Sequence, residues 1–126
     1  MAMTNYLSNA LANATVRNTS YTSPATVYAA LYSVAPTVST GGTELSGNGY
    51  SRQAVTFAAP SAGVVASNVA VTFGPATANW STAVSISICD ASTGGNIMYI
   101  KNISGQNVLN GSSLVYASGD ITITLT

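Results

Sequence analysis

The near absence of charged side chains is the sequence feature that most restricts what this chain can fold into. Three of its 126 residues are basic and three are acidic, so charged residues make up 5% of the chain and the net charge is zero. An average soluble domain carries about 25% charged residues. A surface built from Ser, Thr, Asn and Gly can be buried without removing water from many ions, which is costly. This composition is typical of a protein that packs against others, and it favours self-association.

The same composition excludes several classes of function. Three basic residues cannot form a face that neutralises nucleic-acid phosphates, so we expect no nucleic-acid partner. No apolar run approaches the roughly 20 residues of a membrane span, and the first residues lack the basic start and apolar stretch of a secretion signal. Hydrophobic residues still reach 47%, which suits a packed core. We therefore expect a single domain over residues 1–126, with no membrane partner.

One amphipathic helix and a series of short strands are predicted. The helix is expected over about residues 4–16, with Thr4 as N-cap and an apolar stripe of four residues: Leu7, Ala10, Leu11 and Ala14. Beyond residue 21, the patterns predict strands near residues 26–33, 50–57, 69–73, 84–89, 97–103, 114–116 and 121–125. The predicted fold is mainly β, a single β-sandwich or open barrel of about seven strands with one N-terminal helix.

Some of these segments carry more specific predictions. Residues 26–33 have apolar side chains on both faces, which indicates a central strand. Residues 84–89 alternate between apolar and small polar side chains, so we expect a half-buried strand that forms a hairpin with residues 97–103. Between them, Asp90–Asn96 (DASTGGN) predicts a turn in which Asp90 binds its own backbone and two glycines supply positive φ. Residues 36–49 are predicted to form a long glycine-rich loop.

No group of residues in the sequence predicts catalysis or a cofactor. The chain has no histidine, which excludes Ser–His–Asp and Cys–His arrangements. The carboxylates Glu44, Asp90 and Asp120 are all expected in loops or turns, and the turn at Asp90 resembles a calcium loop only loosely. Cys89 is expected to be a small buried residue. We therefore expect no enzyme, no metal and no cofactor.

The remaining polar and aromatic residues are assigned mainly to structure. Arg17 and Arg52 are expected to bind local partners rather than a ligand. The single tryptophan, Trp80, and the seven tyrosines are compatible with a glycan-binding surface. Most of these rings are expected in the core or on the sheet, because Tyr favours strands.

Four segments together resemble a family of small structural proteins from the virions of tailed bacteriophages. These segments are Tyr21–Ser33 (YTSPATVYAALYS), Gly47–Phe57 (GNGYSRQAVTF), Val71–Trp80 (VTFGPATANW) and Ile88–Asn96 (ICDASTGGN). Members of this family are often labelled phage tail fibre proteins, and related small β-rich proteins serve as capsid cement. The resemblance covers roughly residues 5–100. It departs at Ile88 and Cys89, where the family pattern has an aromatic residue before the aspartate.

The resemblance implies a virion structural protein without catalytic residues. The chain lacks the long periodic repeats of a fibre shaft, which favours the capsid surface over the tail. Our main expectation is a capsid cement or decoration protein that binds the assembled head shell and stabilises it by mass action. The alternative is a tail-associated protein of the tail fibre, baseplate or tail tip. A glycan-binding β-sandwich is the second alternative.

The expected partners are the major capsid protein or other virion proteins, together with further copies of this chain around a symmetry axis. Contact is expected through the segments least needed for the sheet core. These are the helix, with Leu7 and Leu11, and the loop 36–49, with Val38 and Leu45. Trp80 is the fifth candidate interaction residue, as a host contact if the protein lies on the tail.

Overall fold

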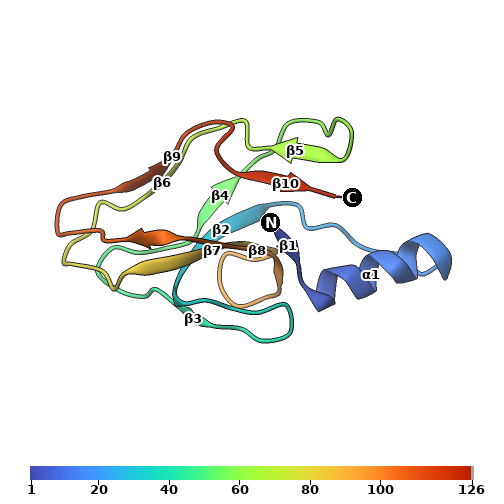
Figure 1. Cartoon of the computed structure of the whole chain (residues 1–126), viewed down its shortest axis with the longest axis horizontal. Coiled ribbons are helices and arrows are strands. Elements are labelled where there is room, and N and C mark those ends of the chain that lie inside the picture. Colours follow the sequence, from blue (N-terminus) through green and yellow to red (C-terminus); the bar gives the residue numbers. More distant parts are fainter. Residues whose placement is uncertain (126) are drawn as a thin grey trace.

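An antiparallel sheet of six strands forms the centre of the structure, a computed structural model in which residues 1–125 are described (Figure 1). Its strands are β1 (Ala2–Met3), β2 (Val27–Val34), β3 (Thr43–Glu44), β4 (Gln53–Val55), β7 (Ala83–Cys89) and β8 (Ile97–Gln106). They follow the order β1-β8-β7-β2-β3, and β4 also pairs with β2. The strand at residues 26–33 is therefore central, as predicted.

Two smaller antiparallel sheets and one helix complete the fold. β5 (Val64–Ala66) pairs with β10 (Thr122–Thr124), and β6 (Val71–Phe73) pairs with β9 (Leu114–Tyr116). Figure 1 shows both pairs on the same side of the large sheet, while the helix α1 (Asn5–Val16) extends away from the sheets. No helix among the described residues is long and apolar enough to cross a membrane.

The main hydrophobic core joins the large sheet to the two small ones. Leu31, Ile86 and Ile88 enter it from the large sheet, Phe73 enters from β6 and Ile123 from β10. Each of these side chains is at most 3% exposed. Successive side chains of a strand point to opposite faces of the sheet. The alternation of Ile86 and Ile88 along β7 therefore places both in this core.

The opposite face of the large sheet buries small polar residues. Ser85, Ser87 and Cys89 are fully buried, so β7 is covered on both faces and the predicted half-buried strand is wrong. The Ser85 hydroxyl donates to the Lys101 carbonyl at 3.0 Å, and the Ser87 hydroxyl donates to the Tyr32 hydroxyl at 3.0 Å. These hydrogen bonds offset the cost of burying the hydroxyls. Cys89 is buried as predicted, beside Ala30 and Tyr32.

The predicted mainly β fold with one N-terminal helix is confirmed, and the helix ends at Val16. The β7–β8 hairpin also forms as predicted, although β8 continues to Gln106. Residues 1–125 contain ten strands rather than about seven, and their sheets do not close into a barrel. The additional strands β1, β3 and β5 have two or three residues each, too few to produce a periodic sequence pattern.

The turn between β7 and β8 has the predicted chemistry. An Asp90 carboxylate oxygen accepts a hydrogen bond from the backbone N–H of Asn96 at 2.7 Å. Gly94 and Gly95 have φ values of 61° and 66°. A Cβ at Gly95 would lie 2.5 Å from Asp90 Oδ1, so this position requires glycine for space as well as for conformation.

Replacing Phe73 with alanine should remove one of the main supports of this core. We expect the free energy of unfolding to fall by about 3–5 kcal/mol, because the ring is fully buried and its loss leaves a cavity. Urea unfolding followed by circular dichroism measures the change. Val115→Ala on β9, the strand paired with β6, is the control because Val115 is 55% exposed. It should change stability by less than about 0.5 kcal/mol, and equal losses in the two variants would contradict this description of the core.

Candidate functional site

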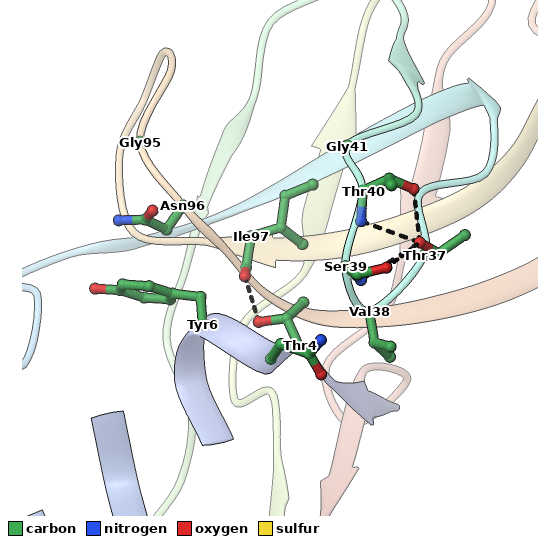
Figure 2. A pocket seen from close by; sticks show the side chains of 11 residues that line it. Thr4, Tyr6, Thr37, Val38, Ser39, Thr40, Gly41, Gly95, Asn96 and Ile97 are labelled. Atoms are coloured by element: carbon green, nitrogen blue, oxygen red, sulfur yellow. Dashed lines mark hydrogen bonds between the residues drawn. The ribbon is translucent and has the colours of Figure 1, made fainter. Parts of the chain in front are cut away.

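An open cleft of about 320 Å³ lies where three segments far apart in the sequence meet (Figure 2). One wall is the start of α1, with Thr4, Asn5 and Tyr6; a second wall is the loop of residues 37–41. Residues 95–97, at the start of β8, complete it. We call this the helix-start cleft. None of the residues that line it carries a charged side chain.

Hydrogen bonds tie the segments of the helix-start cleft to one another. Thr4 caps α1 by accepting from the Leu7 N–H at 3.4 Å, and its hydroxyl also donates to the Ile97 carbonyl at 2.6 Å. The Asn5 N–H donates to the Val38 carbonyl at 2.9 Å. The start of the helix is thereby joined both to β8 and to the loop of residues 37–41. The cleft is consequently part of the folded framework.

The loop of residues 37–41 is ordered by its own hydroxyl groups. Thr37 Oγ1 accepts a hydrogen bond from the Thr40 N–H at 3.0 Å, and the hydroxyls of these two residues lie 2.6 Å apart. The Ser39 N–H also donates to Thr37 Oγ1, at 3.4 Å. Such side-chain-to-backbone bonds are typical of tight turns in threonine-rich segments. The loop therefore presents its polar groups in a fixed arrangement.

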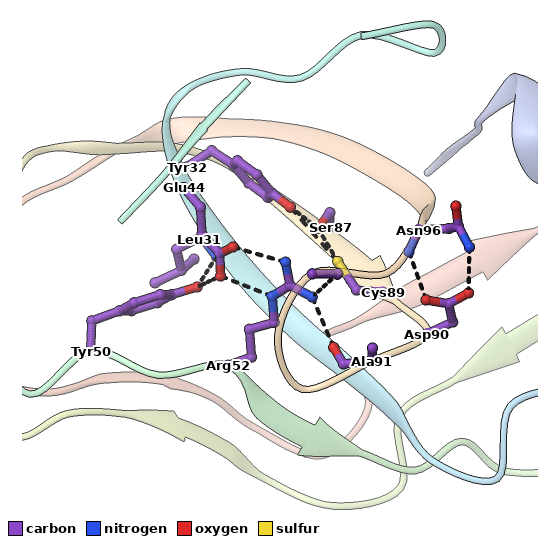
Figure 3. Close-up of polar contacts among 11 residues, drawn as sticks. Leu31, Tyr32, Glu44, Tyr50, Arg52, Ser87, Cys89, Asp90, Ala91 and Asn96 are labelled. Atoms are coloured by element: carbon purple, nitrogen blue, oxygen red, sulfur yellow. Dashed lines mark hydrogen bonds and ion pairs between the residues drawn. The ribbon is translucent and has the colours of Figure 1, made fainter. Parts of the chain in front are cut away.

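A second polar group, which we call the Arg52 cluster, consists of Arg52, Glu44 and Tyr50 (Figure 3). The Arg52 guanidinium donates to both oxygens of Glu44, from Nη2 at 2.9 Å and from Nε at 3.0 Å. Tyr50 donates its hydroxyl proton to Glu44 at 2.7 Å and accepts from the Leu31 N–H at 2.9 Å. The Arg52 side chain is 9% exposed and that of Glu44 is 27% exposed. This bidentate ion pair is largely shielded from water.

Arg52 also holds the turn between β7 and β8. Its Nη1 donates to the carbonyls of Ala91 and Gly94, each at 2.8 Å. The same turn carries Asn96, which forms part of the helix-start cleft. The expectation that Arg52 binds local partners is confirmed. Arg17 likewise contacts a neighbour on its own helix, with Nη1 donating to Asn13 Oδ1 at 3.3 Å.

The electrostatics of the Arg52 cluster suit a structural role. The hydrogen bond to Glu44 raises the pKa of Arg52 above its ordinary value, so the guanidinium stays charged. Burial raises the pKa of Tyr50, and the neighbouring Glu44 carboxylate raises it further. A phenol and a guanidinium that both hold their protons do not serve as bases near neutral pH. Within residues 1–125, no three His, Cys, Asp or Glu side chains gather in a way that would hold a metal ion.

The five predicted interaction residues are distributed between the core and the surface. Leu7, Leu45 and Trp80 are 3%, 6% and 8% exposed and belong to the main core, so their side chains do not face a partner. The first turn of α1 is therefore needed for the core, contrary to our expectation. Leu11 is half-buried against this core. Val38 is 43% exposed and lies at the helix-start cleft, and its contact with a partner stays a prediction.

Trp80 is packed among aromatic neighbours and does not provide the stacking platform suggested by the sequence. Its ring lies edge-on to Tyr50, with the centroids 5.6 Å apart. The indole N–H donates to the Asn48 carbonyl at 2.7 Å. An indole whose polar edge is bonded and whose ring is enclosed is a core residue.

Tyr6 is the exposed aromatic residue that the sequence reasoning missed. It is 42% exposed and lines the helix-start cleft. Its place beside Leu7 on the polar side of a helical pattern does not distinguish it from any other surface residue. The approach of two distant segments gives Tyr6 its neighbours, and no local sequence signal predicts that approach.

Comparison with known proteins gives a match over almost the whole chain. The family model described as Gp80, podophage GP4 fiber I protein gp80, matches residues 2–124. No curated protein matches the chain.

Loss of the Arg52 side chain should weaken the fold by more than an ordinary surface substitution. In Arg52→Met, Glu44 loses its charged partner and two turn carbonyls lose their donor. We expect the free energy of unfolding to fall by about 2–3 kcal/mol, a typical cost for removing hydrogen bonds to a partly buried charge. Guanidinium chloride unfolding tests this. Lys101→Met, at an exposed residue of β8, is the matched control and should stay within about 0.5 kcal/mol of the parent. A stable Arg52→Met protein would show that the cluster is dispensable.

Stability should decline as the pH rises above about 10, the ordinary pKa of a tyrosine phenol. Burial raises the pKa of Tyr32 and Tyr50, so the folded protein keeps these protons while the unfolded chain releases them. The free energy of unfolding therefore decreases with pH in this range and is at its full value below it. Denaturant unfolding at about pH 8 and about pH 11 measures the difference.

The Tyr50→Phe variant is the control for this pH dependence. It lacks one of the two phenols, so it should lose less stability over the same pH interval, whatever its stability at neutral pH. Identical losses in the parent and the variant would show that Tyr50 does not contribute.

Proposed function

The chain belongs to the family of the podophage GP4 fiber I protein gp80, and we propose that it is a non-catalytic structural component of a bacteriophage tail fibre. The observation that carries this proposal is the match of the family model to residues 2–124. The family description names a fibre protein, which favours the tail-associated alternative over the capsid cement role. No finding supports the preference for the capsid surface that the sequence alone suggested.

The surface of the molecule supports a role in packing against other virion proteins. Apolar side chains are exposed on strands and in a loop, with Val34 at 57%, Leu109 at 56% and Val115 at 55%. Charged groups are few, and Arg52 and Glu44 already pair with each other. Burying such a surface removes apolar area from water and dehydrates few ions. We propose other virion proteins as the partners.

Self-association is part of the same proposal. A chain with zero net charge has little long-range repulsion between its copies. The exposed end of α1, where Val16 is 80% exposed, and the exposed Val38 are the surfaces we assign to such contacts. Leu7 and Leu45 are excluded from them because both side chains lie in the core.

Labelling of purified virions distinguishes the tail from the head. Virions of the phage that encodes this chain would be incubated with gold-labelled antibodies raised against the protein and imaged by electron microscopy. We expect gold at the tail, while an antibody against the major capsid protein marks the head as the control. Gold spread over the head would overturn the tail assignment and restore the capsid decoration role. Virions without gold, in a preparation where the capsid control succeeds, would contradict both.

A further inference from the structure

We propose that Asn48 is a site of spontaneous deamidation and that the indole N–H of Trp80 controls the rate. The turn at Asn48–Gly49 combines an exposed asparagine side chain with a glycine whose backbone N–H makes no hydrogen bond within residues 1–125. Asparagine is among the residues most easily degraded in proteins. Deamidation would place a negative charge on a chain whose net charge is zero. This modification is independent of the structural role proposed above.

The reaction needs only water besides the two residues. The Gly49 nitrogen attacks Asn48 Cγ, so that a bond forms between these atoms and the bond from Cγ to Nδ2 breaks. The proton of the Gly49 N–H passes through solvent to Nδ2, which leaves as ammonia, and a cyclic succinimide remains. Water then opens the ring to aspartate or to isoaspartate, in which the main chain runs through Cγ. Glycine favours the attack because it has no side chain to obstruct it.

The turn itself requires both residues of the pair. The Tyr50 N–H donates to the Gly47 carbonyl at 3.0 Å, and φ is 54° at Asn48 and 84° at Gly49. Asn–Gly is the preferred pair for a turn with two positive φ values. A Cβ at Gly49 would also lie 2.8 Å from the Pro75 carbonyl oxygen. The fold therefore places an unobstructed glycine directly after an exposed asparagine.

The second Asn–Gly pair of the chain, Asn110–Gly111, differs in its hydrogen bonding. Both asparagines are exposed, so access to water does not distinguish them. The Gly111 N–H donates to the Ala76 carbonyl at 2.7 Å, however, and this bond must break before the nitrogen can attack. No such bond holds the Gly49 N–H within the described part of the chain. We therefore expect Asn48 to react before Asn110.

Trp80 restrains the motion that the reaction requires. The Gly49 nitrogen reaches Cγ by rotation about the Cα–C bond of Asn48, and the planar peptide unit carries the Asn48 carbonyl oxygen with it. This oxygen accepts from the Trp80 indole N–H at 2.7 Å and from the Thr77 N–H at 3.0 Å. Because Trp80 is 8% exposed and packs in the core, its N–H is held in place. Trp80 is thus a positioning residue for the deamidation.

Mass spectrometry of the folded protein, kept warm in mildly alkaline buffer, measures the reaction. Trypsin cuts after arginine and lysine, so it separates Asn48, in residues 18–52, from Asn110, in residues 102–126. Each peptide is followed over time for the mass gained when an amide becomes a carboxylate, and a sample digested at the start gives the background. We expect Asn48 to deamidate at least about 3-fold faster than Asn110, the factor expected from one hydrogen bond.

The Trp80→Phe variant tests the control by the indole. It removes the N–H but keeps an aromatic ring in the core, and it should speed the deamidation of Asn48 about 2-fold to 10-fold, the usual worth of one hydrogen bond. Asn110 in the same molecule should keep its parental rate. Ile123→Ala is the matched control because it destabilises the same core from β10 without removing a hydrogen bond to Asn48. It should leave the rate at Asn48 unchanged.

Each contrary result has a distinct meaning. A parent protein in which Asn48 reacts no faster than Asn110 would overturn the modification site. An unchanged rate at Asn48 in Trp80→Phe would overturn the role of the indole. Equal acceleration of both asparagines in that variant, or acceleration of Asn48 in Ile123→Ala, would assign the rate to unfolding and overturn it as well. The virion labelling is unaffected by any of these results.

Discussion

The ion pair between Arg52 and Glu44 is the interaction on which the ordering of the surrounding loops depends. The guanidinium joins β3, through Glu44, to the turn between β7 and β8, through the Ala91 and Gly94 carbonyls. Tyr50 extends the connection to the central strand β2 by accepting from the Leu31 N–H. The turn that Arg52 holds leads into Ile97, whose carbonyl accepts a hydrogen bond from Thr4, the cap of α1. One arginine thus lies at the start of a chain of contacts that ends at the helix.

The sequence identifies the elements whose pattern is local. Thr4 and the apolar spacing that includes Leu7 predict α1, and the strands β2, β7 and β8 are long enough to be located from their apolar residues. The turn Asp90–Asn96 is equally local, because its glycines and its aspartate act within seven residues. These predictions are confirmed because each depends on neighbours along the chain.

The features that the sequence does not predict depend on partners far away. The alternation along β7 predicts that Ser85 and Ser87 face solvent, but both are buried. The Lys101 carbonyl and the Tyr32 hydroxyl, which lie far away in the sequence, supply the hydrogen-bond partners that make this burial possible. Trp80 follows a turn segment but is enclosed by Tyr50. The helix-start cleft joins Thr4 to Ile97, residues separated by 93 positions. The periodicity of one segment carries no information about which distant segments it contacts, so Tyr6 could not be assigned to a site from sequence.

The shielding of the Arg52–Glu44 pair has a consequence for the conditions that the protein can tolerate. Dissolved salt screens exposed charges over about 8 Å at physiological ionic strength, but it screens shielded pairs much less. Here the arginine side chain is 9% exposed, and few other charges are present for salt to act on. Screening by salt should therefore change the electrostatic part of the stability of this fold very little. A protein on a particle released into water of varying composition would keep these contacts between one cell and the next.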